Sequence, residues 1–168
     1  TEGMSTAFGP KRSTSRPAMV IHTAVHNIIA VTALLMAVRS VVALQCDKQS
    51  GAGFFVAPGL ILTNAHVLCG PDKLVQVSTV DGQRTFGKVE RIDNYLDLGL
   101  VRVQLTGTSR PSLPMADASL LKPGARVFMV GSPAGLDFTF HEGKVSRVGQ
   151  PLLGLAYVQF DARVNPGN

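Results

Sequence analysis

From residue 40 onward the sequence consists of short apolar runs separated by Gly, Pro and Asp. Runs that are too short for helices and are bounded by turn residues predict β-strands. Six such runs fall in the first part of this region, at residues 40–46, 51–57, 60–64, 74–79, 85–91 and 98–103. Because six strands are enough to close a small barrel, residues 40–105 are predicted to form a first β-barrel.

A second set of strands follows a stretch that contains Gly107, Pro111 and Pro114. This composition predicts a linker over residues 106–114. Beyond the linker, strands are predicted at residues 126–131, 138–148 and 155–160. Three strands leave a barrel of the same size open, so residues 115–168 are predicted to form a partial second barrel. The predicted fold class is all-β, with two barrels of which the second is incomplete.

The N-terminal region is basic and then apolar. Residues 17–38 carry no charged side chain, and three cationic residues precede them: Lys11, Arg12 and Arg16. As a helix this segment would span roughly 33 Å, enough to cross a bilayer core. The basic flank predicts export of the rest of the chain to an extracytoplasmic location, periplasmic or secreted. We therefore interpret residues 1–39 as a leader with an apolar helix, which acts as an anchor, a cleaved signal or a helix packed on the following domain.

The distribution of charge excludes one class of partner. The whole chain has a formal net charge of +5, of which +3 falls within residues 1–44. The remaining residues contain no basic stripe with interleaved aromatic side chains, the pattern typical of nucleic-acid binding. The sequence therefore predicts no nucleic-acid partner.

Two polar residues stand beside the apolar runs of the first barrel. His66 follows the run at residues 60–64, and Asp97 directly precedes the run at residues 98–103. A carboxylate in that position loses solvation unless a donor reaches it, and an imidazole N–H is a suitable donor. The ordinary alternatives are a structural histidine and a turn-capping aspartate. Asp93 is the other candidate for the carboxylate that accepts the imidazole N–H, and we favour Asp97 because it lies closer to the strand.

The last four residues are a third feature, because their sequence Asn-Pro-Gly-Asn predicts a tight turn. Gly167 permits a backbone geometry that points its N–H outward. Peptide hydrolysis by a serine hydroxyl needs a base, a carboxylate that orients the base, and backbone donors for the oxyanion. His66, Asp97 and this turn supply one of these parts each.

The order and spacing of these segments resemble the trypsin-like serine proteases, and within them the HtrA/Deg-like branch. The resemblance extends over about residues 40–168. Six motifs carry it, at residues 51–56 (GAGFFV), 62–67 (LTNAHV), 97–100 (DLGL), 130–135 (VGSPAG), 143–146 (GKVS) and 161–168 (DARVNPGN).

The resemblance implies a serine endopeptidase that acts on polypeptides in extracytoplasmic protein quality control or processing, without a cofactor or metal. It implies that His66 is the general base, that Asp97 orients it, and that Gly167 supplies an oxyanion N–H. Because the family pattern continues into Ser-Gly-Gly, the nucleophile is expected directly after Asn168, and residues 1–168 alone are expected to be inactive. Homo-oligomers are common in this branch.

The resemblance also bears on substrate preference. Val164 falls where the family lines its primary specificity pocket, which implies small or medium apolar side chains at the cleaved position. At the preceding position, the family is expected to have a small residue, and Arg163 departs from this pattern.

Cys46 and Cys69 are the only cysteines. Many trypsin-like proteases bridge comparable positions around the catalytic histidine, so the resemblance implies a disulfide in an exported domain. Two buried thiols are the alternative. A zinc site made by these cysteines and His66 lacks a fourth ligand.

Two further residues invite a chemical role that we do not assign. Ser132 lacks the flanking glycine pattern of a nucleophile turn, and His141 is interpreted as a loop histidine.

Two other function classes remain open. One is a pseudoprotease, a peptide-binding module with this fold but no serine, and the other is a membrane-anchored sensor of misfolded chains.

Overall fold

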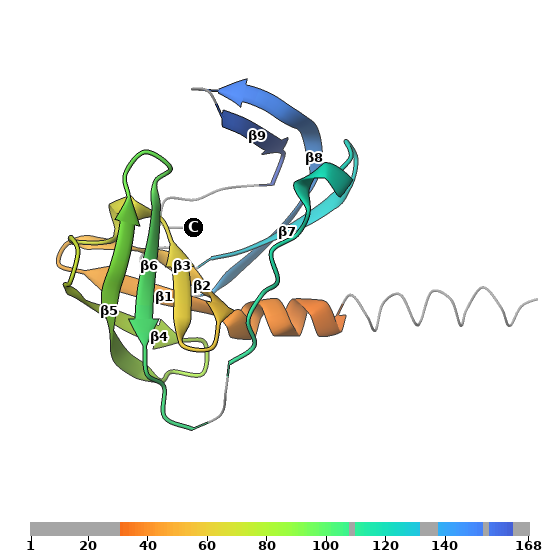
Figure 1. Ribbon diagram of the computed structural model, residues 1–168. Coiled ribbons are helices and arrows are strands. Elements are labelled where there is room, and N and C mark those ends of the chain that lie inside the picture. The colour runs from red at the N-terminus through yellow and green to blue at the C-terminus, as the bar shows by residue number, and fades with distance from the viewer. Residues whose placement is uncertain (1–30, 108–109, 132–137, 153–154, 163–168) are drawn as a thin grey trace, which may run out of the picture. The chain divides into compact units, whose positions relative to one another are not determined.

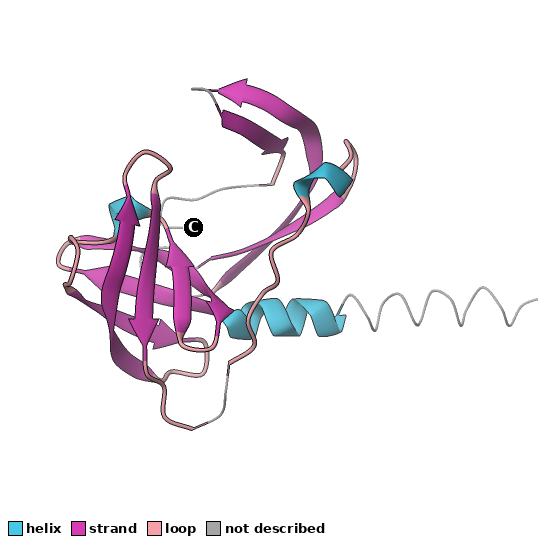
Figure 2. Cartoon of the chain, viewed as in Figure 1, coloured by secondary structure: helices cyan, strands magenta, loops and turns pink. Residues whose placement is uncertain are grey.

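The computed structural model describes residues 31–107, 110–131, 138–152 and 155–162 (Figure 1). The chain divides into two compact units, Thr1–Ala33 and Leu34–Asn168. All described strands belong to the second unit. Strands dominate the described residues, as Figure 2 shows, and the predicted all-β class is confirmed.

The helix that precedes the first strand is described from residue 31 to residue 40. Ser40 was expected to begin a strand, but its hydroxyl donates to the Met36 carbonyl oxygen at 2.7 Å, one helical turn earlier. Among the described residues, the structure contains no helix with the length and apolar character that a membrane span needs. The greater part of the predicted apolar segment, residues 17–30, lies outside the described residues.

Six antiparallel strands close the predicted first barrel, and their order around it is β1-β2-β3-β6-β5-β4. Each strand pairs with two neighbours, so the barrel has no open edge. The strands are β1 (Val41–Cys46), β2 (Gln49–Ala57), β3 (Leu60–Thr63), β4 (Leu74–Thr79), β5 (Arg84–Asp93) and β6 (Leu98–Val103).

The barrel core follows from the alternation of side chains along these strands. In β4 and β6 every second residue is buried, as a strand with one face inward requires. Burial of each such Val, Leu, Ile or Phe side chain contributes about 1.5–3 kcal/mol before the entropy cost of ordering it. The core side chains include Val42, Leu44, Phe55, Ile61, Val67, Leu68, Val75, Val77, Val89, Val101 and Val103.

The second sheet contains β7 (Arg126–Gly131), β8 (Thr139–Leu152) and β9 (Leu155–Phe160), in that order. As predicted, these three strands leave the second barrel incomplete. His141 lies within β8 and pairs with Met129 of β7, so its interpretation as a loop histidine is wrong. The reason is that the ladder between β7 and β8 runs without interruption through His141.

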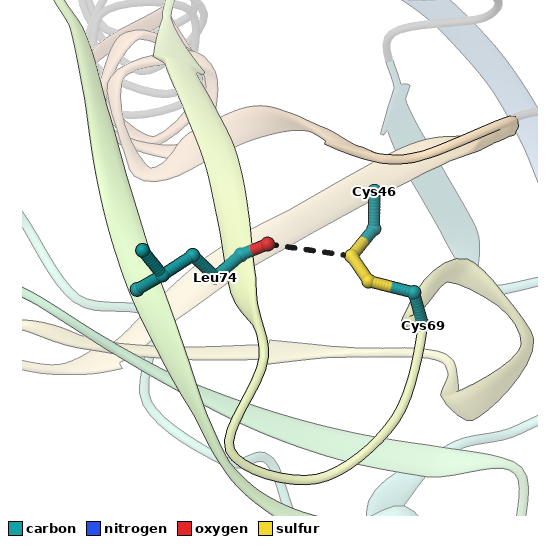
Figure 3. Close-up of a disulfide and its surroundings, with 3 residues drawn as sticks. All are labelled: Cys46, Cys69 and Leu74. Carbon is teal, nitrogen blue, oxygen red and sulfur yellow. Dashed lines mark hydrogen bonds between the residues drawn. A yellow bond between two sulfur atoms is a disulfide. The ribbon is translucent and has the colours of Figure 1, made fainter.

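A disulfide joins the barrel to the segment after β3 (Figure 3). Cys46 is the last residue of β1, and Cys69 lies three residues beyond His66. The two Cα atoms are 5.6 Å apart. Cys46 Sγ lies 3.5 Å from the Leu74 carbonyl oxygen, and because a disulfide sulfur carries no proton, we interpret this approach as a packing contact.

Removal of this disulfide should lower the stability of the barrel. Its two cysteines are 23 residues apart in sequence, and a loop of this size gives an expected loss of about 3 kcal/mol in the free energy of unfolding. Urea unfolding of a Cys46→Ala/Cys69→Ala variant measures the loss. A reducing agent should destabilise the parent protein by a similar amount and leave the double variant unchanged. Equal midpoints for parent and variant would contradict this expectation.

Candidate active site

The position of His66 follows from a short 3₁₀ turn, η1 (Ala65–Val67), directly after β3. Ala65 and Val67 on either side of the histidine are buried, which anchors the turn on the barrel. The His66 side chain points outward and is 69% exposed. The imidazole is therefore accessible to solvent, while the backbone of His66 is fixed on the barrel.

Asp97 occupies the last position before β6 with a φ angle of 53°, in the left-handed region. Non-glycine residues are uncommon in this region, although aspartate tolerates it better than most, and such strain concentrates at functional sites. The Asp97 carbonyl oxygen accepts hydrogen bonds from Ala65 N and Asn64 Nδ2, both at 3.1 Å. These bonds fix the Asp97 backbone beside the 3₁₀ turn.

The side chains of His66 and Asp97 form a direct pair. His66 Nδ1 lies 2.8 Å from Asp97 Oδ2, and the backbone N–H of His66 donates to Oδ1 at 3.0 Å. An ionised carboxylate only accepts hydrogen bonds, so the ring proton is assigned to Nδ1. This tautomer leaves Nε2 with a lone pair that can accept a proton.

The surroundings of Asp97 keep its carboxylate ionised. Partial burial acts to raise the Asp97 pKa, but hydrogen bonds from the backbone and ring of His66, and then from Asn64, outweigh it and hold the pKa below its ordinary value. The stability that these bonds contribute is therefore fully present above the ordinary pKa. It is lost as the pH falls through the lower pKa of the folded state.

Asp93 has a different role from Asp97. Its Oδ1 accepts the backbone N–H groups of Tyr95 and Leu96, both at 3.0 Å, in the turn between β5 and β6. Asp93 is thus a turn-capping aspartate, and the structure places Asp97 beside His66.

Asn64 is a further residue of the site, and its role was not predicted from the sequence. Besides the Asp97 carbonyl, its Nδ2 donates to Asp97 Oδ2 at 3.2 Å, so Asn64 supports the same carboxylate oxygen that faces His66. The signal was present in the motif Leu-Thr-Asn-Ala-His-Val, where Asn64 lies two residues before the histidine. Several other residues considered in the sequence lie outside the described residues: Ser132, Arg163, Val164 and Gly167.

The close approach of Leu68 to Gly99 predicts that a side chain at position 99 lowers stability. A Cβ atom added to Gly99 would overlap Leu68 Cδ1, and Leu68 N donates to Ala65 O within the His66 turn. Gly99→Ala should therefore cost about 1–3 kcal/mol in the free energy of unfolding, which urea unfolding measures. In a Leu68→Ala background the same substitution should cost less, because the clash is relieved. Additive losses would contradict this explanation.

Residues 51–168 match the family described as Trypsin-like peptidase domain. The chain belongs to the trypsin-like peptidases. Its relatives are of the HtrA type. This peptidase domain is 41% identical over 132 residues to the serine protease HTRA4 of Mus musculus. It is 37% identical over 122 residues to the protein named "Probable periplasmic serine endoprotease DegP-like" of Marinomonas sp. (strain MWYL1).

A solved structure gives the same assignment. The HtrA-type protease AlgW with a bound tripeptide superposes with a TM-score of 0.73 at 28% identity. The match covers 82% of this trypsin-like peptidase chain and 48% of the AlgW chain. For HTRA4 and the DegP-like protein, the matched residues cover 74% and 70% of this chain but only 27% and 25% of the relatives.

Proposed function

We propose that this domain supplies the base and the orienting carboxylate of a serine endopeptidase. The observation that carries the proposal is the 2.8 Å contact between His66 Nδ1 and Asp97 Oδ2, which leaves His66 Nε2 free to accept a proton. Membership of the trypsin-like peptidases supports it, since this pair is two thirds of the catalytic triad. The third member is the serine expected after Asn168.

The proposed reaction follows from these roles. His66 Nε2 takes the proton of the serine hydroxyl as the oxygen attacks the peptide carbonyl, and Asp97 stabilises the imidazolium that forms. The backbone N–H of Gly167 donates to the oxyanion. His66 then gives the proton to the leaving amine, and water hydrolyses the acyl-enzyme by the same steps.

The proposed substrates are polypeptides with a small or medium apolar side chain before the cleaved bond, as Val164 implies. The proposed location is extracytoplasmic. The name of the DegP-like relative, which contains the word periplasmic, supports this location, and so does a disulfide within the barrel, because disulfides persist in oxidising compartments. A membrane anchor within residues 17–38 and a homo-oligomer are parts of the same proposal.

The test uses a chain that continues past Asn168. Unfolded casein and short peptides with Ala, Val, Lys or Glu before the cleaved bond are incubated with this chain and with its His66→Ala variant. The proposal expects cleavage after Ala and Val that depends on His66. Binding of casein without cleavage by the parent chain would contradict the proposal and identify a pseudoprotease.

A further inference from the structure

A buried cation lies outside the His66–Asp97 site, at the start of the connection from β6 to β7. The Arg110 side chain is only 7% exposed. Its Nη2 donates to both carboxylate oxygens of Asp81 at 2.7 Å and to Gln83 Oε1 at 3.3 Å. Both partners belong to the turn between β4 and β5. We call Asp81, Gln83 and Arg110 the linker clamp.

Two further contacts extend the clamp along the connection. Gln83 Nε2 donates to the carbonyl oxygen and to the hydroxyl of Thr106, at 3.1 and 3.2 Å. On the other side of Arg110, the backbone N–H of Leu113 donates to the Phe55 carbonyl oxygen of β2 at 2.8 Å. The connection is therefore attached to the first barrel before, at and after Arg110.

The ion pair persists over a wide pH range. The hydroxyl of Thr79, and then the Arg110 guanidinium, lower the pKa of Asp81 to about 2. A lowered pKa means that the contribution of the pair is fully present above the ordinary value of 3.8 and is lost as the pH falls through about 2.

A buried guanidinium is a costly way to gain stability. Desolvation offsets most of the attraction of a buried ion pair, and apolar residues of similar volume often stabilise a protein as well or better. What Arg110 adds is one nitrogen, Nη2, that donates to two residues of the turn between β4 and β5, so both residues fix the position of its side chain. The contacts of Arg110 thus suit the fixing of a geometry.

We propose that Arg110 is a positioning residue for catalysis, which fixes the connection between the barrel that carries His66 and Asp97 and the sheet that leads toward residues 161–168. This inference rests on the proposed function, because the base and the nucleophile then come from opposite sides of the connection. Small errors in the placement of reacting groups are costly in rate, so a released connection should slow the reaction at the serine.

The test is Arg110→Met in a chain that continues past Asn168. Methionine keeps an unbranched apolar side chain without the guanidinium, and Asp81 is half-exposed, so it can be solvated once its partner is gone. The matched control is Arg102→Met, which breaks the exposed pair of Arg102 with Glu90 on the same barrel. Arg110→Lys keeps the charge but not the planar guanidinium that places Nη2 beside Asp81 and Gln83, and should lie between the parent and Arg110→Met.

Two readouts separate positioning from general destabilisation. The first is the rate of covalent labelling by a fluorophosphonate, which should fall about tenfold or more in Arg110→Met and stay unchanged in Arg102→Met. The second is amide hydrogen exchange, which should speed up about tenfold at Leu113 in Arg110→Met, while the Val77 and Val101 amides keep their protection.

The outcomes decide between the explanations. Unchanged labelling, or equally faster exchange at Leu113 and in the barrel core, would overturn the positioning role of Arg110. Absence of labelling in the parent chain would instead count against the proposed function and remove the catalytic role with it. If the parent chain is not labelled, hydrogen exchange still tests the clamp. Equal exchange rates at Leu113 in the parent chain and in Arg110→Met would show that the clamp does not attach the connection to the barrel.

Discussion

Replacement of His66 by Ala should lower kcat by about 10⁶-fold in a chain that continues past Asn168. Without the imidazole, no group takes the proton of the serine hydroxyl, and the oxyanion donors alone remain. The measurement is the rate of hydrolysis of a peptide with Val before the cleaved bond. Because the His66 side chain is 69% exposed and pairs with a half-exposed Asp97, the midpoint of urea unfolding should fall only slightly.

The stability measurement is also the control for this prediction. A loss of activity that accompanies a large loss of stability would mean that His66 is a structural histidine. A loss of less than about tenfold, with stability preserved, would contradict its role as general base.

Asp97→Asn should lower kcat by about 10⁴-fold, the second largest effect that we expect. An amide in place of the carboxylate can present N–H toward the Asp97 Oδ2 position, where His66 Nδ1 and Asn64 Nδ2 both donate. The imidazole then favours the other tautomer, with the proton on Nε2, and cannot accept the serine proton. The measurement is kcat for the same peptide at neutral pH.

Asp93→Asn is the matched control for this substitution. Asparagine keeps an oxygen that can accept the N–H groups of Tyr95 and Leu96, so the turn and the activity should be preserved within a few-fold. Equal losses in the Asp93 and Asp97 variants would show that the turn between β5 and β6, and not the carboxylate beside His66, sets the activity.

Most of the fold could be predicted because the signals are local. Each strand of the first barrel is a short apolar run bounded by turn residues, and six such strands are enough to close a barrel. The order of the strands, in which β3 pairs with β6, was not predicted. The far end of β8 could not be predicted in this way. In the sequence, Gly149 and Pro151 indicate that the strand ends at residue 148. In the structure, the strand continues through a register shift at which Gly149 adopts a φ angle of 70°.

The candidate site was harder to predict from the residues themselves. His66 and Asp97 are 31 residues apart, and the choice between Asp93 and Asp97 depends on which carboxylate the barrel brings to the 3₁₀ turn. The local pattern favoured Asp97 because it lies closer to the strand that follows, and the resemblance to a family then implied its orienting role. Asn64 belongs to the motif around His66, but its bonds to Asp97 join residues 33 apart in sequence and were not predicted. Arg110 was missed because its partners are also distant in sequence and no motif contains it.

The measurement that tests the central claim most directly is the mapping of a fluorophosphonate adduct. A chain that continues past Asn168 and its His66→Ala variant are treated with the reagent, digested and analysed by mass spectrometry. We expect one adduct, on a serine that directly follows Asn168, and its absence from the variant. An adduct on Ser132, an adduct that forms equally without His66, or no adduct in the parent chain would contradict the proposed role of the His66–Asp97 pair.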